Sequence, residues 1–380
     1  MPFPHCRHQI SFVSDQLVPT ILAAIQPGAE PACVHGIVTL QMKDKSRILK
    51  EALENRGRRY QEYVLHDTGQ EAIFSILDKV RDGCQGESIA LNLTGGTKLM
   101  TLAAAEWAYA SDVPTFYMDT GTDKIVWMPP KRRWEYLPLP DLLDVRGLLA
   151  AGGYRVIRDT RDAVPGERHE QLRALVELLC ATNGRDEAAR ALQALNGCAQ
   201  GAKGPERLAE DRATPSPAWR RLRERCHEAG MLDYDNGYIH FPSETARQWC
   251  NGLWFEEYVR MILYKMHSDK RIPSWAASVE VEMNGVPNEL DALFSVRNRL
   301  FVIECKTAAL SERDKANSVL YKADSLRDRL GGLFATSAIC SVLPLNDREL
   351  KWAKELRIRV LSGKKLLRLE ETLAAWASQA

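Results

Sequence analysis

Two acidic residues and a lysine in the last third of the chain have the types and spacing to bind a metal ion and act on a phosphate. Asp291 lies in the strand-like run NELDALF, and Glu304 and Lys306 lie in the strand-like run LFVIECK. If Arg297 and Asn298 form the turn between the runs, pairing sets Asp291 opposite Glu304, with Cβ atoms roughly 4.5–5.5 Å apart. Two carboxylates at that separation repel each other unless a divalent cation such as Mg²⁺ lies between them. Lys306 projects from the same strand face as Glu304 and can orient water or neutralise phosphate charge.

Glu-x-Lys alone is a common sequence, and a surface ion pair on a strand hairpin is the alternative interpretation. The combination with Asp291, thirteen residues before Glu304, and with the helical run GLWFEE at 252–257 is more specific. This combination resembles the PD-(D/E)xK restriction-endonuclease-like superfamily over about residues 245–370, although Leu290 stands where proline is usual before the aspartate. A helix expected over 317–330 and the run GGLFA that follows it resemble the same kind of domain.

The resemblance implies a metal-dependent nuclease and assigns roles to individual residues. Asp291 and Glu304 bind Mg²⁺ or Mn²⁺, and the main-chain carbonyl of Cys305 is a further metal ligand. Glu256, in the first helix, assists at the metal site, with its neighbour Glu257 as the alternative. Lys306 positions or activates the attacking water. The implied catalytic set is therefore Glu256, Asp291, Glu304 and Lys306.

A second motif, LNLTGGTK at 91–98, ends a predicted strand and begins a predicted helix. Its two glycines allow a tight turn, and the helix start offers unpaired N–H groups and positive partial charge to an anion. Its spacing is neither that of a P-loop nor that of a dinucleotide fingerprint. A tight turn without a ligand is the alternative, but ligands of open α/β sheets bind beyond the carboxyl ends of strands. The loops at 14–16 and 119–121 are predicted to open at the same edge.

The runs ISFVSDQLVPT and LNLTGGTKLM together resemble the CRISPR-associated Rossmann fold (CARF) domain over about residues 8–145. That family binds cyclic oligoadenylate messengers at the interface of a homodimer. The resemblance implies that the loop at 94–98 contacts the messenger, with the loop after the first strand beside it. The implied messenger-binding residues are Ser14, Gln16, Thr94, Gly95, Gly96, Thr97 and Lys98.

The elements that must position these motifs divide the chain into three regions. In residues 1–150, strands alternate with helices, which predicts a mostly parallel sheet and a Rossmann-like, sensor-type domain. Its strands are expected over 9–14, 35–40, 60–66, 88–93, 115–119 and 124–128, and its helices over 43–55, 71–80 and 97–110. Residues 245–380 carry helices and strands in the α/β pattern of the nuclease resemblance.

Residues 151–244 have a different pattern, with helices expected over 170–180, 187–195 and 218–229. A hairpin around Asn236-Gly237 follows them, so this region is predicted to be a winged-helix-like linker domain. The last helix carries four arginines, which favours either DNA contact or a spacer or dimerisation module whose arginines are solvated. The second interpretation is preferred because the charge is confined to one helix.

The composition limits the class of protein to which the chain can belong. The chain has 380 residues with 51 Lys+Arg against 50 Asp+Glu, 45% hydrophobic and 27% charged residues, as in ordinary globular proteins. No run approaches the roughly 20 apolar residues of a membrane span. The N-terminus lacks the pattern of a signal peptide, so a cytoplasmic protein without a membrane partner is expected.

The nine cysteines indicate neither a disulfide framework nor a zinc site, because their number is odd and no Cys-x-x-Cys pair occurs. Cys6 and His8 could hold a metal ion, but no second ligand pair lies near them in sequence. Reduced, partly buried thiols are the expected state.

Together the two resemblances imply a homodimeric CRISPR accessory nuclease that cyclic tetra-adenylate activates and that cleaves DNA, RNA or both. One alternative is a messenger-responsive transcriptional regulator, which has no need for Asp291, Glu304 and Lys306. A second alternative is an enzyme that cleaves the messenger itself. It is disfavoured because no histidine or carboxylate cluster adjoins the loop at 94–98.

Overall fold

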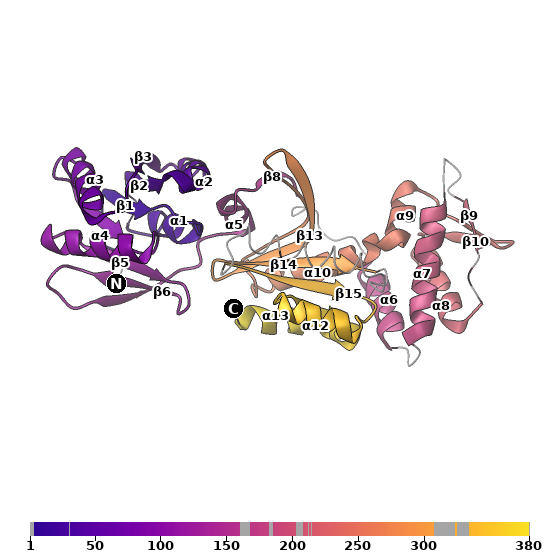
Figure 1. Cartoon of the computed structure of the whole chain (residues 1–380). Helices are drawn as coiled ribbons and strands as arrows, with labels where there is room; N and C mark the ends of the chain where they lie inside the picture. Colours follow the sequence, from indigo (N-terminus) through magenta and orange to yellow (C-terminus); the bar gives the residue numbers. More distant parts are fainter. Residues whose placement is uncertain are drawn as a thin grey trace.

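The computed structural model describes residues 4–29, 31–159, 168–181, 185–202, 208–211, 213, 215–307, 324 and 334–379. Figure 1 shows three parts in a row, with the N-terminal domain at one end, the C-terminal sheet in the centre and the middle helices at the other end. The order in space therefore differs from the order in the chain, and the C-terminal sheet lies between the other two parts.

The N-terminal domain is built on a seven-stranded sheet of order β3-β2-β1-β4-β5-β6-β7. The first five strands in this order are parallel, and β6 and β7 continue antiparallel. The predicted Rossmann-like fold is confirmed, while β7 was not predicted. The strands are β1 (His8–Phe12), β2 (Cys33–Thr39), β3 (Arg59–Leu65), β4 (Ile89–Asn92), β5 (Thr115–Asp119), β6 (Lys124–Met128) and β7 (Glu135–Pro138).

Helices cover both faces of this sheet because alternate strand residues are apolar on each side. Val34 and Val38 of β2 pack with α1 and α2, whereas Ile37 packs with α3 and α4. The helices are α1 (Val18–Ala24), α2 (Lys43–Glu54), α3 (Gln70–Gly83) and α4 (Lys98–Ala110), and α5 (Val145–Ala151) follows the sheet. Strand order reverses between β1 and β4, so the loops after these two strands border the crevice where such sheets bind ligands.

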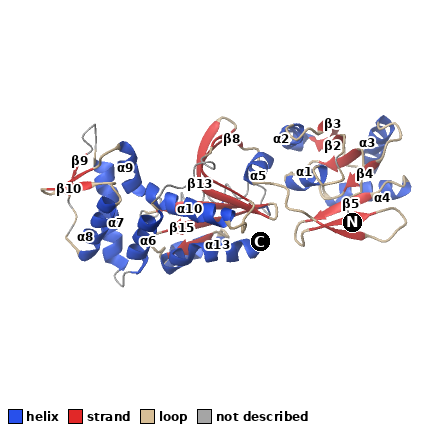
Figure 2. Cartoon of the chain, turned by 180° about the vertical axis from the view of Figure 1, so that it is seen from behind, coloured by secondary structure: helices blue, strands red, loops and turns tan. Residues whose placement is uncertain are grey.

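In the described residues of the middle region, three helices lie with a small antiparallel sheet of order β10-β11-β9 (Figure 2). The winged-helix-like character of this region stays a prediction. Its elements are α6 (His169–Ala181), α7 (Arg185–Gly201), β9 (Leu208–Glu210), α8 (Pro217–Glu228), β10 (Asp233–Asp235) and β11 (Tyr238–His240). On α8, Arg223 pairs with Asp211 at 2.9 Å and Arg225 with Glu228 at 2.8 Å. These two arginines therefore form ion pairs within the middle region itself.

The C-terminal domain is built on a six-stranded mixed sheet of order β16-β15-β14-β13-β12-β8. The placement of β8 differs from the sequence prediction, which put these residues in the linker region that begins at 151. Three of its four residues pair with β12, more than a hundred positions later, and so short a strand carries no sign of that partner. The strands are β8 (Arg155–Arg158), β12 (Ser274–Met283), β13 (Val286–Val296), β14 (Arg299–Lys306), β15 (Ala335–Ser341) and β16 (Arg359–Ser362).

The helices of this domain share one core with the middle region. Leu192 of α7 and Leu222 of α8 belong to the same buried cluster as Phe255 and Phe294. The helices are α9 (Glu244–Gln248), α10 (Trp254–Ser268), α12 (Asp347–Glu355) and α13 (Leu369–Ser378), with a π-helical turn at Trp249–Leu253. The helix expected over 317–330 lies outside the described residues, apart from residue 324. Among the described helices, none is long and apolar enough to cross a membrane.

Candidate active site and ligand-binding edge

The β13–β14 hairpin has the register predicted from the sequence. Arg297 and Asn298 form its turn with φ of 51° and 57°, and the pairing runs from Val296–Arg299 to Ala292–Ile303. The next residues in this register are Asp291 and Glu304, as the two-residue turn predicts. The Asp291 carboxylate accepts a hydrogen bond of 2.7 Å from the backbone N–H of Cys305, which fixes its orientation beside β14.

Lys306 and Glu304 form an ion pair at this site rather than at an open surface. The Lys306 ammonium donates to Glu304 Oε1 at 2.8 Å, and Glu304 is only 6% exposed. Burial alone would lower the pKa of Lys306, but the charges of Glu304 and Asp291 outweigh it, and the pKa is raised. Lys306 is therefore a fixed cation at neutral pH.

Glu256 of α10 is the first-turn glutamate whose pKa responds to this carboxylate group. Burial raises the pKa of Glu256 to about 8, and the negative charges of Asp291 and Glu289 add to the effect. Glu257 instead accepts a hydrogen bond of 2.8 Å from the indole N–H of Trp249. The two neighbours thus lie in different environments, and Glu256 is the one that the acidic residues of β13 and β14 influence.

A glycine lets α10 begin close to the end of β14. Gly252 has φ of 129°, and a Cβ at this position would lie 2.9 Å from the hydroxyl of Thr307, which directly follows β14. A residue with a side chain would therefore have both backbone strain and a steric clash there. The close approach at Gly252 brings the first turn of α10, with Glu256, to the Glu-x-Lys strand.

A cavity of about 330 Å³ lies next to the acidic group. Its lining includes Glu256, Glu257 and Ser278, together with Trp249 and the arginines Arg168 and Arg260, which pair with Glu257 at 3.8 and 3.9 Å. Ser278 lies in β12 between the residues that pair with Leu290 and Ala292, so it is level with Asp291. Cationic and acidic side chains therefore line one concave surface beside the candidate catalytic residues.

The different environments of Glu256 and Glu257 predict opposite effects on stability in the metal-free protein. Because the folded state holds the Glu256 proton up to about pH 8, stability falls as pH rises from the unfolded-state pKa of roughly 4.3 through that value. At pH 9 in EDTA, Glu256→Gln is expected to raise Tm by at least about 2 °C. Glu257→Gln is the matched control and is expected to lower Tm, because the Trp249 contact weakens. Equal shifts in calorimetry would contradict this assignment.

In the N-terminal domain, the loops after β1 and β4 touch. A Cβ on Gly95 would lie 2.3 Å from the carbonyl oxygen of Phe12 and 3.4 Å from the Ser14 hydroxyl, and Gly96 has φ of 87°. Both glycines are thus required for the turn itself. The same turn brings the exposed start of α4 beside Ser14 and Gln16, at the crevice between β1 and β4.

The residues of the 94–98 loop differ in what their side chains contact. The Thr94 hydroxyl donates to Asn92 Oδ1 at 2.6 Å and accepts from the N–H of Met118 at 2.8 Å, so it ties β4 to β5. The Thr97 hydroxyl caps α4 by accepting from Met100 N–H. Gly96, Thr97 and Lys98 are exposed. Thr94 therefore shapes the loop, while the next turn faces solvent.

Two features near these sites were missed from the sequence. Glu289 is two residues before Asp291 on β13, and its charge contributes to the raised pKa of Glu256. The signal in the sequence was this spacing of two residues, which places both side chains on one face of a strand. Asn298 was assigned only a turn role, yet it is 1% exposed and accepts hydrogen bonds from the N–H groups of Leu142 and Leu143 at 2.8 and 3.0 Å. No sequence pattern indicates a contact over that separation.

Comparison with known families accounts for both sheet domains. Residues 9–137 match the Card1 CARF domain, and residues 243–380 match the Card1-like endonuclease domain. A search of curated proteins finds no match.

The whole chain has the fold of solved structures. Protein VC1899 from Vibrio cholerae has a TM-score of 0.84 and 24% identity, with 98% of each chain covered. Can2 from Sulfobacillus thermosulfidooxidans, solved in complex with cyclic tetra-adenylate, has a TM-score of 0.79 and 25% identity over 97% of this chain and 99% of that chain. A type III CRISPR defence DNA nuclease activated by cyclic oligoadenylate has a TM-score of 0.54 and 19% identity over 90% of this chain and 46% of that chain.

Proposed function

We propose that this protein is a CRISPR accessory nuclease which cyclic tetra-adenylate activates. The reason is that the chain joins a region that matches the Card1 CARF domain to one that matches the Card1-like endonuclease domain. The observation that carries the proposal is the group of Asp291, Glu304 and Lys306 on one hairpin, whose charges also act on Glu256 in the first turn of α10. A messenger-responsive regulator does not account for an endonuclease domain with these residues. The substrate is a nucleic acid, and DNA is the first candidate, since the structurally similar type III defence protein is a DNA nuclease.

The acidic group suits Mg²⁺ or Mn²⁺. Carboxylate and carbonyl oxygens are the ligands that these hard cations prefer, and Asp291, Glu304 and the carbonyl of Cys305 would supply them. The raised pKa of Glu256 reflects negative charge crowded into a buried place, which a divalent cation would relieve. When bound, the ion polarises a phosphoryl oxygen and lowers the pKa of water.

The remaining chemistry belongs to the side chains themselves. Lys306, held at 2.8 Å by Glu304, donates hydrogen bonds to the attacking water or to a non-bridging phosphate oxygen and so stabilises the charge that develops there. The backbone N–H of Cys305 keeps Asp291 in its orientation. Arg168 and Arg260 of the adjoining cavity pair with Glu257 at 3.8 and 3.9 Å, and we expect them to contact a neighbouring phosphate of the substrate as well.

We expect cleavage to require Mg²⁺ or Mn²⁺. Excess EDTA should reduce cleavage to the background of protein-free reactions, and Mg²⁺ or Mn²⁺ alone should restore it, because the ligands are oxygens. Cleavage of labelled DNA after chelation and re-addition measures this. Undiminished cleavage in excess EDTA would refute the metal-site proposal and leave the messenger site untouched.

A homodimer is supported by an apolar strip beside the messenger loop. Leu99, Leu102 and Tyr109 of α4 are 74%, 67% and 64% exposed, which is unusual for large apolar side chains on one helix. A second copy of the chain would cover this face and bring two Lys98 side chains together. A ring of four identical nucleotides presents the same face twice, as a two-fold interface requires.

Lys98→Ala is expected to raise the concentration of cyclic tetra-adenylate needed for half-maximal cleavage by at least about tenfold, because one charge-assisted phosphate contact is lost per subunit. Lys79→Ala, at an exposed lysine of α3, is the matched control and should leave activation unchanged. Calorimetry should give one messenger per two chains. One messenger per chain, or unchanged activation in Lys98→Ala, would contradict the shared site.

The messenger edge is connected to the catalytic hairpin by direct contacts. Arg299, the first residue of β14, donates to the Asp123 carboxylate at 3.1 Å and to the carbonyl of Thr120, in the loop after β5. The turn before it is held by Asp141, whose carboxylate accepts from the N–H groups of Arg297 and Asn298 at 2.8 Å each. We refer to these contacts as the hairpin clamp.

The clamp gives the messenger a physical route to the active site. The loop at 119–121 opens at the same sheet edge as the messenger loop, and β14 runs from Arg299 directly to Glu304 and Lys306. A messenger that binds one arrangement of this edge more tightly shifts the protein toward that arrangement. Through the clamp, the same shift moves the strand that carries the catalytic pair.

A further inference from the structure

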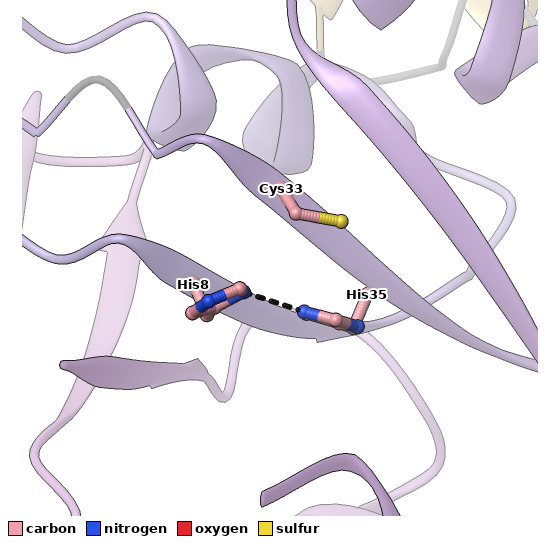
Figure 3. A group of neighbouring side chains, drawn as sticks. All are labelled: His8, Cys33 and His35. Atoms are coloured by element: carbon pink, nitrogen blue, oxygen red, sulfur yellow. Dashed lines mark hydrogen bonds between the residues drawn. The ribbon is translucent and has the colours of Figure 1, made fainter. Parts of the chain in front are cut away.

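A group of metal-ligating side chains lies at the edge of the N-terminal sheet opposite the messenger loops. His8 begins β1 and is paired in register with Cys33, which begins β2. His35 follows two residues later on the same face of β2. Figure 3 shows His8 and His35 directed toward each other, with Cys33 beside them.

The ligand atoms of these residues are close enough to hold one ion. His8 Nδ1 lies 2.9 Å from His35 Nε2, and one ligand atom each from His8, Cys33 and His35 lie within 4.8 Å of one another. Cys84, at the end of α3, lies outside this 4.8 Å group but is close to it: its Sγ is 3.7 Å from His35 Nε2, and its thiol donates to the carbonyl of Val80 at 3.1 Å. A small movement of this side chain would supply the fourth donor. Cys33, His35 and Cys84 are 6%, 4% and 2% exposed, so the group is nearly closed to water.

A carboxylate behind His8 favours the tautomer of this residue that binds metal. Glu87 Oε2 lies 2.7 Å from His8 Nε2, so a proton on Nε2 is donated in a hydrogen bond to this carboxylate and the Nδ1 lone pair faces the group. In the metal-free protein this lone pair accepts from His35 Nε2 at 2.9 Å, a hydrogen bond that the ion would replace. A carboxylate behind a histidine is the usual outer partner of a metal-binding imidazole.

We propose that His8 Nδ1, His35 Nε2 and the thiolates of Cys33 and Cys84 bind one zinc ion. Nitrogen and sulfur donors in a set of four are typical of closed, tetrahedral zinc sites. Two nitrogens on one tetrahedral zinc lie roughly 3.3 Å apart, so the histidines would separate by a few tenths of an ångström. Binding releases one proton from each thiol to water. The ion would link β1, β2 and the end of α3. It would thus stabilise the N-terminal sheet at the edge opposite the messenger loops.

The site would not have been found from the cysteine count. Cys6 and His8, the pair first suggested by their spacing, do not form it, because Cys6 packs in the core on the other face of the sheet. The ligands come instead from β1, β2 and α3, and only the Cys-x-His spacing at 33–35 was visible in the sequence.

Cobalt substitution in the full chain tests the proposal, because thiolate-to-cobalt charge-transfer absorption does not arise at an all-oxygen site. One equivalent of Co²⁺ added to metal-stripped protein should produce that absorption, and Zn²⁺ should abolish it. Cys33→Ser should remove about half of the absorption and weaken binding at least tenfold, and Glu87→Gln should weaken it about 10–100-fold. Cys6→Ser, a buried cysteine outside the group, is the matched control and should change neither.

Absence of thiolate absorption in the wild type, or absorption unchanged in both Cys33→Ser and Cys84→Ser, would overturn the proposal. If a buried cysteine variant does not fold, Glu87→Gln decides, because that side chain is 42% exposed and its loss leaves the core intact. Cobalt affinity of Glu87→Gln equal to that of the wild type would then count against the site.

Discussion

Replacing Glu304 with glutamine is expected to slow phosphodiester cleavage by at least about 10²–10³-fold, the usual cost of losing one charge-stabilising group in an active site. The change removes a carboxylate metal ligand and also the partner that fixes Lys306. Lys306→Ala should have a similar effect. Single-turnover cleavage of labelled DNA at saturating cyclic tetra-adenylate measures both, and calorimetry should show unchanged messenger binding.

Glu282→Gln is the matched control for this prediction. Glu282 lies on β12 of the same sheet but pairs with Arg155 at 2.8 Å, away from the acidic group. Its cleavage rate should stay within about twofold of wild type, a change of about 0.4 kcal/mol in the barrier. Near wild-type cleavage by both Glu304→Gln and Lys306→Ala would show that another group performs the reaction.

Arg299→Ala is expected to uncouple messenger binding from cleavage. Among the described residues of the β13–β14 turn and the start of β14, only Arg299 has a side chain that hydrogen-bonds to the loop after β5. Its partners there are Asp123 and Thr120. Coupling free energies between sites are typically about 1–3 kcal/mol, so activation should fall by about 5–150-fold. Messenger affinity and cleavage as functions of messenger concentration give the two quantities separately.

Arg297→Ala is the control here, because this exposed neighbour joins the clamp through its backbone N–H and not through its side chain. It should activate like the wild type. Asp123→Ala should match Arg299→Ala, and the double variant should be no worse than either single one if the two residues act as one contact. Full activation of Arg299→Ala would rule out the clamp as the route between the domains.

The acidic site was predictable from sequence because its parts are local. A two-residue turn fixes the pairing of β13 with β14, and that register alone brings Asp291 level with Glu304. The sequence could not distinguish Glu256 from Glu257, since both lie in the first turn of α10. Their environments differ because residues far away in the chain bury Glu256 and raise its pKa.

The alternating strands and helices of the N-terminal domain were predictable for a similar reason. The bounds of β5 and β6 agree with the prediction because a short hairpin connects them. The strand β8, the histidine–cysteine group and the hairpin clamp were missed because each joins residues far apart in the chain. Asn298 and Leu142 are 156 positions apart, and nothing in either local pattern indicates the other.

The central claim is that a messenger bound at the CARF domain switches on the nuclease domain of the same protein. The direct test is the rate of cleavage of labelled single-stranded and plasmid DNA, with Mn²⁺ present throughout, as cyclic tetra-adenylate is added. We expect cleavage to rise from background and to saturate at one messenger per two chains. Equal cleavage with and without the messenger, or none on DNA or RNA at saturation, would contradict the claim.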